Sequence, residues 1–263
     1  IFMVKTFSYF IQAIIIYIFF IIGRILGIKI SRKFFSFIFS KVAPIFKSKK
    51  IIENNLNIFN KKITDKQKKQ IISNMWKNYG MTFIEYIFLD LFKKNNSHIY
   101  IIGEENLKNV IIKKKPVIFV SGHFANFELM SMEITKKNIP LATIYRPLNN
   151  FFLNPFMEYL RKKFVCKHQI KKGINGVREA IEYIKKDFSI ALMIDQRVSE
   201  GEKINFFDKP ALTTTLPAQL SMKYNLPIIP VFIERVNEKD FKLKFYSEIS
   251  PTNFTNKIDL SIK

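Results

Sequence analysis

The chain has 263 residues, of which 43 are Lys or Arg and 21 are Asp or Glu, so its formal net charge is +22. A hydrophobic fraction of 48% excludes a disordered chain, and the length suits one ordinary domain with or without an appendage. A single cysteine excludes a disulfide framework and any multi-cysteine zinc or iron–sulfur site.

The positive charge has two sources that must be separated. Of the 43 basic residues 36 are Lys, in a chain dominated by Ile, Asn and Lys, so part of the charge reflects composition. The rest indicates a surface that meets an anionic partner, such as lipid headgroups, nucleic acid or an acidic protein. The position of the charge along the chain distinguishes these partners.

The first element predicted along the chain is a membrane anchor. No charged residue occurs between Lys5 and Arg24, and residues 13–22 read AIIIYIFFII. A helix of about 18–22 residues spans roughly 30 Å, the thickness of a bilayer core. A signal peptide would be followed by a small-residue cleavage site, which is not found here; a buried core helix is the remaining alternative. Positive charge is heavier after the segment, which places the remainder on the cytoplasmic side.

A basic segment follows the predicted anchor. Residues 29–69 hold 12 Lys or Arg against Glu53 and Asp65, a local net charge of +10, interleaved with bulky apolar residues from Phe34 to Phe46. Such a segment beside a membrane span indicates contact with an anionic interface. Nucleic-acid binding would call for a reader motif, and none is present, so we expect no nucleic-acid partner.

The next predicted element is a helix that starts at a capping box, Thr64–Gln67. Apolar residues recur every three to four positions from Ile71 to Ile87, as one buried helix face requires, and Trp76 belongs to that face. We therefore divide the chain into an anchor over residues 1–28, a basic helical membrane-proximal region over 29–95, and a core over 96–263.

The core has an α/β pattern. Short β-rich runs occupy residues 99–102, 117–121, 141–145, 189–194 and 228–234, with helical stretches between most of them. Alternating strands and helices predict a mostly parallel central sheet flanked by helices. A further run at residues 242–246 is expected to pair antiparallel at an edge.

The most informative segment is VIFVSGHFANFELM at residues 117–130. An apolar strand ends at a Ser-Gly pair, His123 follows, and a helix is expected to open near Asn126, with Glu128 in its first turn. The carboxylate of Glu128 could fold back onto the imidazole of His123, fix its tautomer and stabilise the imidazolium that forms when His123 takes a proton. The carboxyl end of a strand is also where open α/β sheets bind ligands.

The block SGHFANFE resembles the His-x4-acid motif of the lipid A biosynthesis acyltransferases, the late lauroyl/myristoyl-transferase family within the glycerolipid acyltransferase superfamily. Two further stretches look like the second and third blocks of that family: IYRPLNN at residues 144–150 and MIDQRVSEGEKINFFDKPALTTT at residues 193–215. The apolar run IIPVFI at residues 228–233 is similar to the strand that follows the third block. An N-terminal membrane anchor is usual in the family.

The resemblance implies a single-pass protein of the bacterial inner membrane with its catalytic domain on the cytoplasmic face. It implies transfer of a fatty acyl chain from acyl-carrier protein, or from acyl-CoA, to a hydroxyl of a lipid A precursor or related glycolipid. His123 would be the general base and Glu128 would orient it. No Ser or Cys nucleophile is needed, which fits the isolated Cys166, and no cofactor is implied.

The resemblance also suggests substrate-binding residues. Arg146 would hold a phosphate or polar headgroup of the acceptor or stabilise the oxyanion, and Asn149 lies in the same block. Asp195 and Gln196 end a strand of the sheet and would either line the pocket or pin the following loop by hydrogen bonds. Arg197 lies in that loop and is expected to contact substrate.

Several alternatives stay open. His98 and His168 lie among polar residues in the sequence and are expected to be solvated. No cluster with metal-ligand spacing is found, so no metal is predicted.

The acceptor could instead be a lysophospholipid or another glycolipid. A non-catalytic adaptor that binds anionic lipid through residues 29–69 is the alternative from another class. Relatives usually carry a further C-terminal helical segment, so the C-terminus is expected to be truncated.

Overall fold

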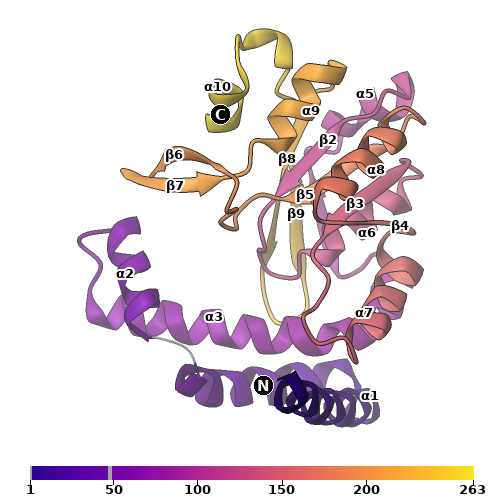
Figure 1. The fold of residues 1–263 in the computed structure, drawn as a ribbon. Helices are drawn as coiled ribbons and strands as arrows, with labels where there is room; N and C mark the ends of the chain where they lie inside the picture. Colours follow the sequence, from indigo (N-terminus) through magenta and orange to yellow (C-terminus); the bar gives the residue numbers. More distant parts are fainter. Residues whose placement is uncertain (1, 47–48) are drawn as a thin grey trace. The chain divides into compact units, whose positions relative to one another are not determined.

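The computed structural model describes residues 2–46 and 49–263, which form two compact units (Figure 1). The first, which we call the helical unit, comprises Ile1–Leu89 and Asn205–Lys209; the second, the sheet unit, comprises Asp90–Ile204 and Pro210–Lys263. The three-part division expected from the sequence, with boundaries at residues 28 and 95, stays a prediction.

The first helix, α1 (Phe2–Phe46), is broken at Gly27, where φ is +74° and ψ is 161°. This positive φ costs glycine little because it has no Cβ. Residues Met3–Ile45 are long and apolar enough to cross a membrane, and only 17% of their most apolar window is buried, so α1 is a candidate membrane span. The basic residues Lys29, Arg32, Lys33 and Lys41 lie on the helical segment after the break.

The helix α3 (Asp65–Glu85) packs against α1 within the helical unit. It begins with the predicted capping box: the Gln67 backbone N–H donates to Thr64 Oγ1, and Gln67 Oε1 accepts from the Thr64 backbone. Trp76 is buried, as predicted. The rings of Phe20 and Phe35 pack on Phe83 with centroids 5.1 and 5.7 Å away, and these aromatic contacts fix how the two helices meet.

A buried ion pair also joins α1 to α3. Arg32 Nε donates to Glu85 Oε1 at 2.6 Å, with both side chains almost fully buried. Nearby, Arg24 Nη1 donates to the Ile87 carbonyl at 3.0 Å. The unit also contains α2 (Lys49–Phe59) and a 3₁₀ turn, η1 (Tyr86–Phe88).

The sheet unit is built on seven strands in the order β1-β9-β8-β2-β5-β3-β4. Every pairing is parallel except β8–β9, which confirms the mostly parallel α/β class. The strands are β1 (Ile99–Ile102), β2 (Ile118–Ser121), β3 (Leu141–Tyr145), β4 (His168–Lys171), β5 (Ser189–Met193), β8 (Ile228–Arg235) and β9 (Phe241–Phe245). The hairpin strands β6 (Glu202–Phe206) and β7 (Lys209–Thr213) form a separate two-stranded sheet.

Helices flank the sheet (Figure 1). Their bounds are α4 (Leu89–Lys94), α5 (Glu105–Lys113), α6 (Glu128–Lys136), α7 (Asn154–Leu160), α8 (Ile174–Ile184), α9 (Leu216–Tyr224) and α10 (Lys257–Ile262), with a π-helical turn η2 (Arg161–Val165) and a 3₁₀ turn η3 (Pro251–Asn253). Alternate residues of the central strands, such as Ile118 and Val120, form one apolar cluster with Ala180 of α8 and Leu220 of α9. Because side chains alternate across a strand, this cluster occupies one face of the sheet.

Two sequence expectations about this unit are wrong. The strand β9 does pair antiparallel with β8, but it is not an edge strand, because β1 pairs parallel with its other side. His98 and His168 are not solvated: the His98 side chain is 11% exposed, and His168 Nδ1 lies 3.1 Å from the Tyr183 hydroxyl. Their polar neighbours in sequence hid the fact that both histidines pack on aromatic rings, Phe92 and Phe188 respectively.

Candidate active site

The candidate site lies at the carboxyl edge of the sheet. Strands β2, β5 and β3 are consecutive neighbours and run parallel, so their carboxyl ends meet at one edge (Figure 1). The loop after β2 carries His123, the loop after β5 carries Asp195, and Arg146 follows β3 directly. Three residues far apart in sequence are therefore brought to one edge by strand order.

The imidazole of His123 pairs with Asp195. His123 Nδ1 lies 2.7 Å from Asp195 Oδ1, and the His123 backbone N–H donates to Asp195 Oδ2 at 2.9 Å. The carboxylate thus holds both the ring and the backbone of His123. Because an ionised carboxylate only accepts hydrogen bonds, Nδ1 carries the proton and Nε2 is left as the basic nitrogen.

This pair is accessible. The side chains of His123 and Asp195 are 30% and 36% exposed. Partial burial would raise the pKa of Asp195, but the hydrogen bonds from the His123 ring and backbone together outweigh it and hold that pKa below its ordinary value. Asp195 is therefore ionised at neutral pH, as a carboxylate that orients a base must be.

Close packing holds the two loops together. A Cβ added at Gly122 would lie 2.7 Å from the Phe124 ring and 3.3 Å from Asp195 Cβ, so the small residue lets the loops approach. The ring of Phe127 stands edge-on to the imidazole, with centroids 4.7 Å apart. The first residues after β2 are thus shaped around the His123–Asp195 pair.

Glu128 is placed differently from its expected position against His123. Its Oε1 accepts from both Nε and Nη2 of Arg161 at 2.7 Å, and the two side chains are 8% and 11% exposed. Glu128 starts α6 and Arg161 starts η2, so the ion pair ties these two elements together. The five-residue spacing favoured a His–Glu pair, but the helix α6 turns Glu128 into the interior, while Asp195 in the loop after β5 reaches the imidazole.

A second carboxylate network extends from Arg161. The Arg161 guanidinium lies over the Tyr145 ring, 5.7 Å from its centroid. Tyr145 donates its hydroxyl hydrogen to Glu158 Oε1 at 2.5 Å, and Asn154 Nδ2 donates to the same oxygen at 2.7 Å. These contacts fix the end of β3 against α7, directly before Arg146.

The other predicted site residues follow the strands of the same edge. Arg146, Asn149, Gln196 and Arg197 are all exposed and follow β3 or β5 in the chain. Their exposure makes them accessible to a ligand, but the geometry assigns them no individual task. Asp195 was predicted as a pocket or loop-pinning residue, and in the structure it is the hydrogen-bond partner of His123.

Two other kinds of catalytic group can be considered, a cysteine nucleophile and a bound metal ion. Burial raises the pKa of the Cys166 thiol to about 11, which disfavours a thiolate nucleophile at neutral pH. Within residues 2–46 and 49–263, no group of three or more His, Cys, Asp or Glu side chains could hold a metal ion.

Arg161 is the site residue that sequence reasoning missed. It is one of only seven Arg in a chain with 36 Lys, so the choice of a guanidinium was itself a signal. The spacing gave no reason to connect Arg161 with Glu128, 33 positions earlier, because the link depends on how α6 and η2 pack.

Comparison with known proteins gives one family. The model of the family described as "Bacterial lipid A biosynthesis acyltransferase" matches residues 3–259, nearly the whole chain. No curated protein matches significantly. The match includes every residue of the carboxyl-edge site described above. The chain belongs to the bacterial lipid A biosynthesis acyltransferase family.

Proposed function

We propose that this acyltransferase moves a fatty acyl chain from the thioester of acyl-carrier protein to a hydroxyl of a lipid A precursor, with His123 as general base. The observation that carries the proposal is the accessible His123–Asp195 pair at the carboxyl edge, in a chain of a lipid A acyltransferase family. The family supplies acyl transfer and the lipid A class of acceptor. The donor, the base and the residues that bind substrate are our proposal.

The reaction begins when the acceptor hydroxyl gives its proton to His123 Nε2. Its oxygen attacks the thioester carbonyl, and a tetrahedral intermediate forms. Collapse of the intermediate breaks the C–S bond and forms the ester. The departing thiolate takes the proton from the imidazolium, so the carrier leaves as a thiol and His123 returns to its neutral form.

Asp195 supports this cycle by its charge. It accepts from Nδ1–H, so the ring cannot turn its protonated nitrogen toward the acceptor, and it stabilises the imidazolium between the two proton transfers. Glu128 acts one step further away, as a positioning residue. By holding Arg161 it fixes the start of α6, and so the end of the loop that carries His123.

The exposed residues around the pair would hold the acceptor. Arg146 offers a bidentate guanidinium for a phosphate of a lipid A precursor, and Arg197 adds a second cation at the neighbouring strand end. Asn149 and Gln196 would accept or donate hydrogen bonds to sugar hydroxyls and amides.

The candidate span α1 would place the reaction at a bilayer. Positive charge after the span favours a cytoplasmic location for the rest of the chain, which would be the cytoplasmic face of the inner membrane. Acyl-carrier protein is acidic and cytosolic, so the basic segment at residues 29–69 would attract it as well as anionic lipid.

The decisive experiment removes the base. We expect His123→Ala to lower kcat by about 10²–10⁴, the usual contribution of a general base, in an assay with acyl-carrier-protein donor and lipid A precursor. His168→Ala, which deletes another imidazole of the sheet unit, is the matched control and should keep activity within a few-fold. Activity of His123→Ala close to wild type would rule out the mechanism. Mass spectrometry of the product separates a lipid A precursor from a lysophospholipid as acceptor.

A further inference from the structure

A cleft of about 450 Å³ opens at the opposite edge of the sheet from the candidate active site. We call it the lysine cleft and define it by Lys93, Lys162, Lys163 and Lys167 together with the rings of Phe164 and Phe188. Leu141 and His168, the first residues of β3 and β4, also line it, as does Pro140 just before β3. The cleft therefore lies at the amino ends of strands whose carboxyl ends form the active-site edge.

The two sites are separated by the length of the strands. The strand β3 has five residues, so about 15 Å of strand separates its two ends. A small ligand in the lysine cleft would therefore not contact the His123–Asp195 pair directly.

The charged side chains that line the lysine cleft, among the residues that the structure describes, are all lysines. Four Lys line it, and among the residues that the structure describes no Asp or Glu does. Lys162 and Lys167 are exposed at its rim. Lys163 Nζ donates to the Tyr159 hydroxyl at 2.6 Å and lies 5.3 Å from the Phe164 ring centroid, which keeps its ammonium group beside the aromatic wall.

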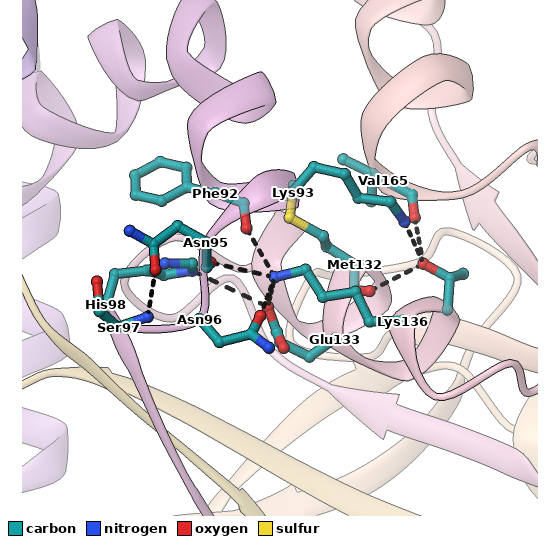
Figure 2. Close-up of polar contacts among 11 residues, drawn as sticks. Phe92, Lys93, Asn95, Asn96, Ser97, His98, Met132, Glu133, Lys136 and Val165 are labelled. Carbon is teal, nitrogen blue, oxygen red and sulfur yellow. Dashed lines mark hydrogen bonds and ion pairs between the residues drawn. The ribbon is translucent and has the colours of Figure 1, made fainter.

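Lys93 is half-buried, whereas the other three lysines are exposed. Figure 2 shows Lys93 among the polar contacts of its surroundings. Its Nζ donates to Thr135 Oγ1 at 3.3 Å, and that hydroxyl lies 2.8 Å from the Met132 carbonyl and 2.9 Å from the Val165 carbonyl. The contacts of Thr135 join α6 to η2 and place Lys93 against both.

The nearest buried carboxylate is already occupied. Glu133 Oε1 lies 2.7 Å from Lys136 Nζ and 3.9 Å from His98 Nε2, and Lys136 also donates to the Phe92 carbonyl at 2.6 Å (Figure 2). Glu133 thus pairs directly with Lys136, and its charge also acts on Lys93. Burial, and next the charge of Lys136, lower the pKa of Lys93 by more than the charge of Glu133 raises it. An incoming anion would therefore stabilise the charged form of this side chain.

We propose that the lysine cleft binds an organic phosphate with a flat apolar portion. The lysines supply the several point charges that suit a dianionic phosphate, while Phe164 and Phe188 supply an apolar wall for the attached group. A volume of about 450 Å³ suits a small molecule and is too small for a folded partner. The inference is independent of the catalytic mechanism proposed above.

The test uses phenyl phosphate as the probe and inorganic phosphate as the comparison. Isothermal titration calorimetry on the full chain in detergent should show saturable binding of phenyl phosphate, with inorganic phosphate at least several-fold weaker. The double variant Lys162→Gln/Lys167→Gln should weaken phenyl phosphate about tenfold or more, because it removes two of the four positive charges that would meet the phosphate. No binding at millimolar phenyl phosphate would overturn the proposal.

Two controls make the result specific to the lysine cleft. Lys108→Gln/Lys239→Gln removes the same charge from exposed positions of the sheet unit and should change the affinity less than twofold. If both double variants weakened binding equally, the effect would be general charge and the proposal would fail. Arg146→Gln tests the active-site edge: unchanged binding supports a separate site, while loss of binding would place the phosphate at the catalytic edge and overturn the proposal.

Discussion

The carboxyl edge of the sheet carries two carboxylate pairs that differ in accessibility. The His123–Asp195 pair is about one-third exposed, whereas the Glu128–Arg161 pair is about one-tenth exposed. A group that exchanges protons with a substrate must be reachable, while a buried ion pair that loses a partner leaves an expensive unpaired charge. The comparison favours proton transfer by the first pair, as proposed above, and structural positioning by the second.

The largest expected effect comes from Asp195→Asn in the exposed pair. A neutral amide no longer selects the tautomer with the proton on Nδ1 or stabilises the imidazolium, so kcat should fall by about 10³–10⁴, as in the analogous Asp→Asn change of a serine-protease triad. Stability should change little because the side chain is exposed. Steady-state kinetics together with thermal unfolding would measure both.

The control for this change is Asp187→Asn. Asp187 is exposed and has a φ of +60°, a conformation that Asn tolerates, so both activity and stability should be preserved. If Asp195→Asn retained most of its activity, Asp195 would not be the residue that orients the base, and Glu128 would have to be reconsidered for that role.

For the buried Glu128–Arg161 pair we expect a loss of stability, in contrast to the loss of activity expected for Asp195→Asn. Glu128→Gln leaves the Arg161 guanidinium buried without its counter-charge, and we expect about 3–5 kcal/mol of lost stability. Glu128→Leu/Arg161→Leu removes both charges and should recover most of that loss, since an apolar pair of similar size avoids the desolvation penalty. Denaturant unfolding in detergent measures both variants. A loss below about 1 kcal/mol for Glu128→Gln would show that the pair is not structural.

Features that depend on neighbouring residues in the chain could be predicted from the sequence, whereas features that depend on distant residues could not. Local signals predicted local features: the capping box at Thr64 and the strands at residues 99–102 and 141–145 have the expected bounds. The strand β4 was missed because it is an edge strand with a mostly polar sequence, in which only Ile170 is fully buried. The position of β9 was wrong because strand order is a tertiary property.

The same limit applies to the candidate site. The His123 loop could be predicted because strand, Gly, His and helix are consecutive in the chain. The partner of His123 could not, since Asp195 is 72 positions away and reaches it only because β2 and β5 are neighbours. The scarce arginines were an unused signal: Arg24, Arg32 and Arg161 each make a hydrogen bond or ion pair that joins two elements.

The smallest expected effect concerns Tyr145, whose hydrogen bond to Glu158 supports the edge that both pairs share. Burial, and next this hydrogen bond, raise the pKa of Tyr145, so its hydroxyl stays a donor throughout the physiological range. Burial would raise the pKa of Glu158, but hydrogen bonds from Tyr145 and Asn154 and the nearby lysines outweigh it and lower that pKa. Tyr145→Phe should therefore cost about 1.5 kcal/mol at neutral pH, the value of one hydrogen bond to a charged group.

The dependence of this loss on pH distinguishes the hydrogen bond from packing. A carboxylate whose folded pKa is depressed contributes stability above its unfolded pKa of about 4.3, and that contribution disappears as pH falls through the folded pKa. The difference in unfolding free energy between wild type and Tyr145→Phe should be full above about pH 5 and shrink below about pH 4. Tyr159→Phe, which removes an exposed hydroxyl, should cost less than about 0.5 kcal/mol at every pH. A loss for Tyr145→Phe that persisted unchanged in acid would assign it to packing of the ring and leave Glu158 without a role at this edge.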